Sequence, residues 1–257
     1  MLNIIACFKW VIDEADIKVD KGSRRLILDR VSYKISAYDR NAIEEAARLQ
    51  ERHGGSVAAV TVAPPTAKQC IKDALSRGPD KAYFVNDPSF ADIEPSQTAS
   101  LLAAAITSRI EFDLIICGEG SSDLYAQQVG PALAERLGIP CATYVNKLTY
   151  VESERLVIAD RKLEEGTETV SVPLPALVTI LPDTNTPRIP TLKQVLGAAK
   201  KPIENIPLDA LGQTYAPRLQ TIDTLGATMD RRRLKFGPDP EGIRSVIGAL
   251  MKEGVIA

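Results

Sequence analysis

Short apolar runs alternate with helical patterns along the first 145 residues of the chain. The runs are rich in Val, Ile and Ala, which is typical of strands buried on both faces. Between the runs, apolar residues recur every three or four positions, which predicts amphipathic helices. Strands are expected at Leu2–Phe8, Ser56–Val62, Lys81–Val85, Asp113–Cys117 and Cys141–Val145, and helices near residues 39–54, 66–78, 96–110 and 126–137.

This alternation predicts an α/β fold. Strand–helix–strand units of this length cross over in the right-handed sense and build a mainly parallel sheet with helices on both faces. Asp39 stands just before the first apolar position of the first long helix, so we expect it to cap that helix. Gly54 follows the same helix and predicts its end.

Two segments depart from the strand–helix rhythm and predict β-hairpin additions to the fold. The stretch from Asp13 to Asp29 contains two short apolar pieces, 17–19 and 25–28, separated by the turn residues Lys21-Gly22-Ser23. Residues 146–180 read as strand–turn–strand without an intervening helix. The strands expected there are Leu148–Val151, Leu156–Asp160, Thr167–Val172 and Ala176–Ile180.

After Pro182 the sequence becomes interrupted by prolines and weakly periodic as far as Met229. Such a stretch has too little apolar patterning to pack a core of its own. We therefore expect an α/β domain over residues 1–190 and an extended C-terminal arm over residues 191–257 that packs on a partner protein. A last amphipathic helix is expected at 240–253.

Composition narrows the class of protein. With 45% hydrophobic and 25% charged residues, and 31 basic against 33 acidic side chains, the chain has no strong field that would attract nucleic acid or a membrane surface. No apolar run has the length of a signal peptide or of a membrane helix, so a cytoplasmic location is expected. The single histidine disfavours zinc and Ser-His-Asp chemistry. The four cysteines lie in apolar segments without metal-ligand spacing and are expected to be buried and reduced: Cys7, Cys70, Cys117 and Cys141.

The candidate chemistry lies where strands end. Parallel sheets bind ligands at the carboxyl ends of their strands, and the fourth strand runs into the loop Gly118-Glu119-Gly120-Ser121-Ser122-Asp123. The glycines permit close backbone approach, the serines offer hydroxyl donors, and the next helix directs free N–H groups to the same space. This pattern fits an anion or nucleotide site, with backbone groups meeting the charge because the loop has no lysine. It lacks the Lys-Ser/Thr ending of a Walker loop, and an ordinary strand–helix turn is the alternative.

Other segments resemble one protein family, the electron transfer flavoprotein β subunits. The signature covers Ala159-Asp160-Arg161, Glu164-Glu165-Gly166, Glu168, Val170, Pro175 and Leu177-Val178-Thr179, a stretch that by itself reads as a charged hairpin turning at Gly166. The segments Lys9–Asp13, Ser36–Ala46 and Asn185–Pro202 resemble further parts of the family. The sequence of Cys117–Gly130 is similar to the one that recurs in the FixA branch, and the resemblance extends to about Gly212.

The resemblance implies a Rossmann-like, adenine-nucleotide-binding domain that forms a heterodimer with an FAD-carrying α subunit. The pair would carry electrons between dehydrogenases and acceptors, and this subunit would not be catalytic alone. AMP is expected in this subunit, and Leu192 is expected to dock an acyl-CoA-type dehydrogenase. The nucleotide contacts implied are Cys7, Ser36, Ala37, Tyr38, Asp39, Val62, Gly118, Gly120, Ser121, Ser122, Asp123, Leu124, Gln127, Gln128 and Val129.

Two departures from the family pattern leave alternatives open. Many bifurcating members have an Asp and a Thr where this chain has Tyr125 and Ala126, which favours AMP over a second FAD. Lys162 follows Arg161 at a position that is usually acidic. The alternatives are a bifurcating subunit that binds a second FAD and oxidises NADH, and a nucleotide-binding domain without a redox role.

Overall fold

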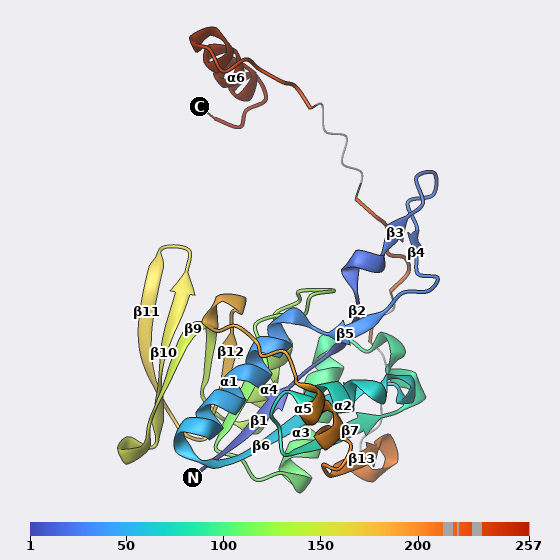
Figure 1. Cartoon of the computed structure of the whole chain (residues 1–257), viewed down its shortest axis with the longest axis vertical. Helices are drawn as coiled ribbons and strands as arrows, with labels where there is room; N and C mark the ends of the chain where they lie inside the picture. Colours follow the sequence, from blue (N-terminus) through green and yellow to red (C-terminus); the bar gives the residue numbers. More distant parts are fainter. Residues whose placement is uncertain (213–217, 220, 228–232, 257) are drawn as a thin grey trace. The chain divides into compact units, whose positions relative to one another are not determined.

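The computed structural model describes residues 1–212, 218–219, 221–227 and 233–256. Contacts divide the chain into two units: Met1–Lys18 with Ile27–Asp223, and Val19–Leu26 with Thr224–Ala257. The first unit contains a nine-stranded sheet with helices on both faces, so the predicted α/β fold is confirmed (Figure 1).

The strand order of the sheet is β11-β10-β9-β12-β8-β1-β6-β7-β13. Strands β12, β8, β1, β6, β7 and β13 run parallel, as does the pair β9–β12, whereas β9, β10 and β11 are antiparallel. The strands are β1 (Leu2–Cys7), β6 (Gly55–Ala63), β7 (Lys81–Asn86), β8 (Leu114–Gly118), β9 (Cys141–Val151), β10 (Leu156–Leu163), β11 (Gly166–Pro173), β12 (Ala176–Ile180) and β13 (Ile203–Pro207).

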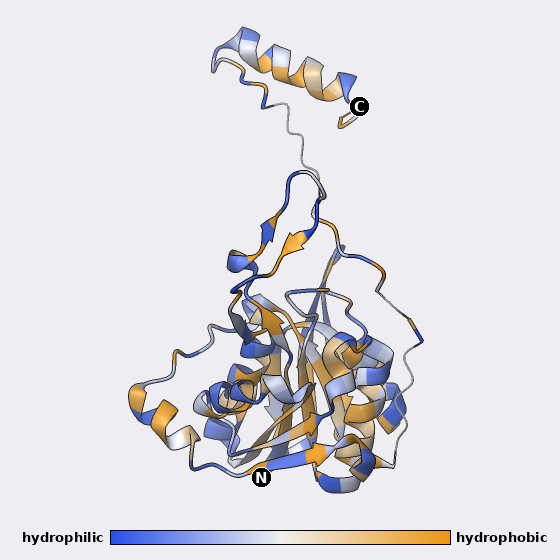
Figure 2. Cartoon of the chain, turned by 90° about the vertical axis from the view of Figure 1, so that its right-hand side faces the viewer, coloured by the Kyte–Doolittle hydropathy of each residue, from blue (hydrophilic) through white to orange (hydrophobic). Residues whose placement is uncertain are grey.

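Alternate residues of the central strands enter two different cores. Ile4 and Ala6 of β1 face α1 (Ala37–His53), α2 (Gln69–Ser76) and α5 (Leu192–Ala198). Ile5 and Cys7 face α3 (Pro95–Arg109) and α4 (Val129–Leu137). This alternation is the two-residue period of a strand, and it makes the parallel strands apolar on both faces. Figure 2 shows the hydrophobic strands at the centre, between the helices.

The hairpin additions are present in part, because the strands expected at Cys141–Val145 and Leu148–Val151 are one strand, β9, and β12 lies inside the sheet, parallel to β8 and β9. Strand β2 (Trp10–Ile12) pairs with β5 (Tyr33–Ile35), and β3 (Lys18–Val19) pairs with β4 (Leu26–Ile27), where the short hairpin was expected. The charged hairpin β10–β11 turns at Gly166, whose φ of 149° favours glycine.

Part of the expected arm contributes to the sheet. The stretch from residue 191 contains α5, and β13, which pairs in parallel with β7 at the sheet edge. The second unit contains α6 (Pro240–Lys252), which begins where Asp239 accepts a hydrogen bond of 2.7 Å from the amide of Gly242. No helix among the described residues is long and apolar enough to cross a membrane.

Two local expectations were wrong. Ser36, not Asp39, holds the N-cap position of α1; Asp39 is the third helical residue, and its side chain turns toward the sheet. Cys7, Cys70 and Cys117 are buried as expected, but Cys141 is exposed, because it opens β9 at the end of a surface loop.

Candidate functional site

A pocket opens at the carboxyl ends of β1 and β8, the two central strands. From β1 the chain proceeds outward through β6 and β7, and then returns to β8 on the other side of β1. The loops after β1 and β8 therefore diverge, and such a switch point is where open α/β sheets bind ligands. The pocket has about 810 Å³ of empty volume, including the solvent at its mouth.

A buried carboxylate joins the two strand ends beside this pocket. Asp39 accepts a hydrogen bond of 2.8 Å from the amide of Lys9 and one of 3.2 Å from the amide of Gly118. Burial raises the pKa of Asp39 to about 7, and the two backbone hydrogen bonds offset only part of that rise. Gly118 leaves room for this arrangement, since a Cβ there would lie 2.6 Å from the Asp39 carboxylate.

The glycine-rich loop is held by side chains from the start of α1 and from the first strand end. The amide of Ser122 donates to the Ser36 hydroxyl at 3.2 Å. The Lys9 ammonium lies 2.6 Å from the Asp123 carboxylate. Hydrogen bonds and the Lys9 charge hold the pKa of Asp123 below its usual range, although burial acts in the opposite direction.

Tyrosine rings cover one side of the same loop. The rings of Tyr38 and Tyr125 are 5.2 Å apart between centroids. Gly120 lies under Tyr125, because a Cβ at Gly120 would be 2.4 Å from the ring. Tyr125 and Gln127 both have positive φ, 46° and 56°, so the loop is a tight and locally strained turn.

Glu119 is a second buried carboxylate in the pocket wall. It accepts a hydrogen bond of 2.6 Å from the amide of Tyr144 and a short one from the Thr179 hydroxyl. Burial raises the pKa of Glu119 above its usual value. These contacts attach the glycine-rich loop to β9 and β12, so Glu119 stabilises the pocket wall.

The pocket offers hydrogen-bond donors to an anion. Within the described residues, the amides of Gly120 and Ser121 donate to no protein group. The amides of Val129 and Gly130 stand in the first turn of α4, where the helix itself provides no carbonyl to accept from them. Free amides and a helix N-terminus favour negative charge, and Lys9 adds a basic side chain to the wall.

The structure brings most of the predicted nucleotide residues together. The five that do not line the pocket lie at the start of α1 and in the glycine-rich loop: Ser36, Ala37, Tyr38, Ser122 and Asp123. The ten that line it are Cys7, Asp39, Val62, Gly118, Gly120, Ser121, Leu124, Gln127, Gln128 and Val129.

Sequence reasoning missed several wall residues. Lys9 stands at a recognised strand end, and its place directly after the strand was a usable signal. Ile93, Thr98 and Leu102 come from α3 and the loop before it, and the residues themselves carried no signal. Their helix reaches the site only through packing against the sheet.

The signature hairpin lies elsewhere on the sheet. Arg161 donates from Nε to the Thr143 carbonyl at 2.9 Å and pairs with Glu168 across the hairpin. Lys162, at the usually acidic position, pairs with Asp183 at 2.8 Å. Leu192, the predicted docking residue, is the first residue of α5 and is 75% exposed.

Comparison with known protein families decides the assignment. The model of the electron transfer flavoprotein domain matches residues 25–211, which include β8, the glycine-rich loop and the signature hairpin. The chain belongs to the electron transfer flavoprotein family.

Membership of this family places the chain among electron-transport proteins that work with flavin. The matched segment supplies most of the wall of the switch-point pocket. No group of three or more His, Cys, Asp or Glu side chains in the described part of the chain could hold a metal ion.

Proposed function

We propose that this chain is the β subunit of an electron transfer flavoprotein of the FixA-like branch. It pairs with an α subunit that carries FAD, and the pair carries electrons between a dehydrogenase and an acceptor in the cytoplasm. The FAD of the partner supplies the redox chemistry. This chain contributes a nucleotide site and surfaces for the two partners, and it is not catalytic alone.

The observation that carries the proposal is the pocket at the β1–β8 switch point, most of whose wall comes from the matched electron transfer flavoprotein domain. We propose that it binds AMP. The free amides of Gly120 and Ser121, with the first turn of α4, suit the phosphate. Apolar side chains of Val62, Ile93 and Leu102 line the wall and suit the adenine.

AMP fits these residues better than a second FAD. A second flavin brings a pyrophosphate, which requires further donors along the loop. At the two positions where bifurcating relatives have Asp and Thr, this chain has Tyr125 and Ala126, and Tyr125 is engaged with Tyr38. The loop therefore offers fewer polar side chains for a second phosphate.

Helix α6, in the C-terminal arm of residues 191–257, is proposed to pack on the α subunit. In α6 the apolar side chains of Ile243, Ile247, Leu250 and Met251 are 37–54% exposed. They recur every three or four residues and so form one stripe along the helix. A stripe of this kind requires a covering surface, and the FAD-carrying subunit is the proposed one.

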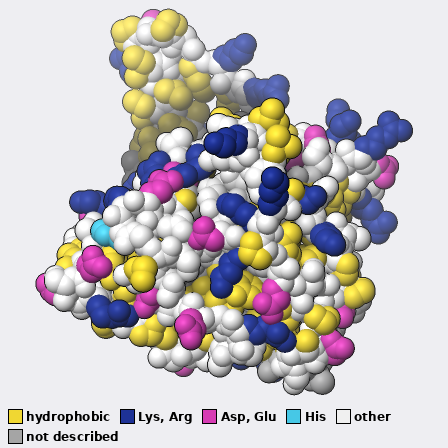
Figure 3. Space-filling view, turned by 60° about the horizontal axis from the view of Figure 1, so that its bottom comes forward, with side chains coloured by type: hydrophobic (Ala, Val, Ile, Leu, Met, Phe, Trp, Pro, Cys, Tyr) yellow, Lys and Arg dark blue, Asp and Glu magenta, His cyan; other side chains and the backbone are white. Residues whose placement is uncertain are grey.

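A second exposed apolar surface is proposed to dock the dehydrogenase. Ile189, Leu192, Val195 and Leu196 are between 50% and 90% exposed, and we name them the α5 patch. Lys193 and Lys200 are exposed beside it, so an apolar recess with an acidic rim suits it. On the face shown in Figure 3, basic and acidic side chains are interspersed.

Co-expression with an electron transfer flavoprotein α subunit tests the pairing. The proposal predicts a one-to-one complex on a sizing column with a visible flavin spectrum of one FAD per pair. This chain expressed alone should carry no flavin and should associate or aggregate through α6. A monodisperse, cooperatively unfolding monomer that ignores the α subunit would contradict the pairing, and two flavins per pair would favour the bifurcating alternative.

A further inference from the structure

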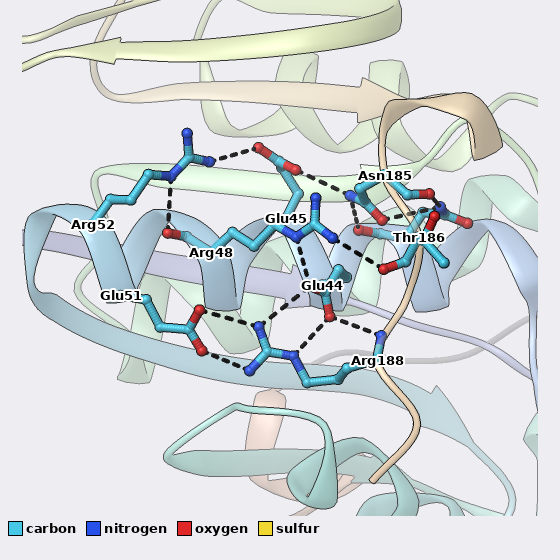
Figure 4. Close-up of polar contacts among 9 residues, drawn as sticks. Glu44, Glu45, Arg48, Glu51, Arg52, Asn185, Thr186 and Arg188 are labelled. Atoms are coloured by element: carbon cyan, nitrogen blue, oxygen red, sulfur yellow. Dashed lines mark hydrogen bonds and ion pairs between the residues drawn. The ribbon is translucent and has the colours of Figure 1, made fainter.

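A polar cluster fastens the segment between β12 and α5 to the outer face of α1 (Figure 4). Its members come from positions 137–144 residues apart in the sequence, so the contacts are tertiary. The residues are Asn41, Glu44, Glu45, Arg48, Glu51, Arg52, Asn185, Thr186 and Arg188.

Arg188 is the centre of this cluster. Its guanidinium contacts Glu44 at 2.7 and 3.3 Å and Glu51 at 2.6 and 3.3 Å, which makes both pairs bidentate. The amide of Arg188 also donates to Glu44, at 3.0 Å. We call Glu44, Glu51 and Arg188 the Arg188 clamp. Bidentate pairing fixes direction as well as distance, so the clamp sets the orientation of the chain at residue 188.

Glu44 is the buried half of the clamp, with its side chain 5% exposed. Burial alone would raise the pKa of Glu44, but hydrogen bonds from Arg188 and Arg48 outweigh it and hold the pKa below the usual value. Removing either partner would leave a buried charge with fewer contacts, so the attachment is not easily broken and remade.

Further bonds hold the same segment on both sides of Arg188. The side-chain amide of Asn41 donates to the carbonyl of Asn185 at 2.8 Å, and Asn185 donates in return to the carbonyl of Asn41 at 3.1 Å. Arg77, near the end of α2, donates to the carbonyl of Arg188 at 3.2 Å. The segment is thus fixed to α1 and α2 directly before the chain enters the α5 patch.

The helix that follows has little apolar anchoring of its own. Among the residues of α5, Ala198 alone is buried. A hollow of about 650 Å³, open to solvent, lies beside it and is lined by Glu51, Ser76, Arg188 and Gln194 among others. The first turn of α5 is closed by the capping box of Thr191 and Gln194. The helical conformation of α5 is therefore stabilised by contacts within the helix and its cap, whereas the orientation of α5 depends on the Arg188 clamp and on contact with α2.

We infer that Glu44 and Arg188 are positioning residues that hold the α5 patch in the orientation in which the dehydrogenase partner binds it. This inference rests on the proposed docking function of Leu192. Neither residue touches the partner in this account. They act by restricting the motion of α5 before the dehydrogenase binds, which lowers the entropic cost of docking.

The experiment compares Arg188→Gln, Arg188→Lys and Glu44→Gln with the parent, each as the complete pair with its α subunit. Arg136→Gln is the matched control, because Arg136 is exposed on α4, which packs on the opposite face of the sheet from α1 and α5. Amide hydrogen exchange should become at least tenfold faster over residues 186–198 in the clamp variants. Exchange in β1 and β8 should stay at the parent rate, as should all exchange in the control.

Kinetics then distinguish positioning from simple structural support. With a purified acyl-CoA dehydrogenase that reduces the parent pair, the clamp variants should show an apparent KM for the pair raised about fivefold or more, with kcat unchanged. Arg188→Lys should lie between the parent and Arg188→Gln, since lysine keeps the charge but loses the fork. If Arg188→Gln does not fold, the decision passes to Arg188→Lys.

Parent-like exchange over residues 186–198 would overturn the inference. So would faster exchange with an unchanged KM, or a loss confined to kcat. Leu192→Ala is measured in parallel to test the docking function itself. If Leu192→Ala also leaves KM unchanged, the docking surface is wrong; if it raises KM while the clamp variants do not, the positioning role alone is wrong.

Discussion

The Asp39 carboxylate accepts a hydrogen bond of 3.2 Å from the amide of Gly118, the last residue of β8. The same carboxylate holds the amide of Lys9 after β1, so one buried side chain couples the two strand ends that form the pocket. This is a costly arrangement for a carboxylate, because burial raises its pKa from 3.8 to about 7.

The raised pKa predicts a pH dependence of stability. Between about pH 4 and pH 7 the folded protein keeps Asp39 protonated, whereas the unfolded chain has released that proton. The contribution of Asp39 to the free energy of unfolding therefore decreases as pH rises through this window, by up to about 4 kcal/mol. Asp39→Asn has no such proton, so its unfolding free energy should decrease less over the window.

Denaturant unfolding of the parent and Asp39→Asn at several pH values measures this difference. Asp183→Asn supplies a control with the same substitution at a half-exposed carboxylate. Parallel curves for parent and Asp39→Asn would show that Asp39 is not the titrating group.

A side chain added at Gly120 should weaken the retention of bound nucleotide. A valine there would drive its Cβ into the ring of Tyr125, at 2.4 Å in the present geometry. Tyr125 is 43% exposed and can move, so we expect the loop to be displaced and the fold to remain. Gly120→Val should retain bound nucleotide at least tenfold more weakly than the parent, which corresponds to about 1.4 kcal/mol.

Two variants serve as controls for Gly120→Val. Ser121→Ala removes a hydroxyl and leaves the amide, so its loss should be smaller. Gly197→Val adds the same side chain where nothing lies within 4 Å of the new Cβ, and it should retain nucleotide like the parent. Equal retention in Gly120→Val and Gly197→Val would refute the role of the loop.

Substitution of Leu192 should weaken docking of the dehydrogenase without lowering the stability of the fold. Thr191 is the N-cap of α5 and Leu192 is its exposed first residue, so Leu192 does not cap the helix. Leu192→Ala should slow electron transfer from the dehydrogenase several-fold, since a leucine at the centre of an interface contributes on the order of 2 kcal/mol. Flavin content and the melting temperature should stay within error of the parent. A lower melting temperature with unchanged transfer would show that Leu192 serves the fold instead.

The strand and helix elements of the first 180 residues could be predicted because local patterns determine them. Buried parallel strands are continuous apolar runs, and the helices between them have a clear period, as in β6 and α1. The place of the pocket also followed in part, because parallel sheets bind ligands at the carboxyl ends of their strands and the glycine-rich loop stands at one of these ends.

Features that depend on distant partners could not be read from the sequence. Asp39 fits an N-cap pattern, and only the approach of β1 and β8 shows that its carboxylate serves their amides. Strand β13 is a short edge strand between Pro202 and Pro207, with Ile206 as its buried residue, so it carries almost no periodic signal. The pairing of Arg188 with Glu44 spans 144 residues, and each side chain alone reads as an ordinary surface charge.

The central claim is that the β1–β8 pocket holds AMP, and release of the bound nucleotide tests it most directly. The purified α/β pair is denatured with acid, and the supernatant is separated by chromatography against AMP and FAD standards. We predict one AMP and one FAD per pair, with the AMP reduced in Gly120→Val and retained in Gly197→Val. Two FAD and no AMP per pair would contradict the AMP assignment, and FAD as the only nucleotide, at one per pair, would contradict the site itself.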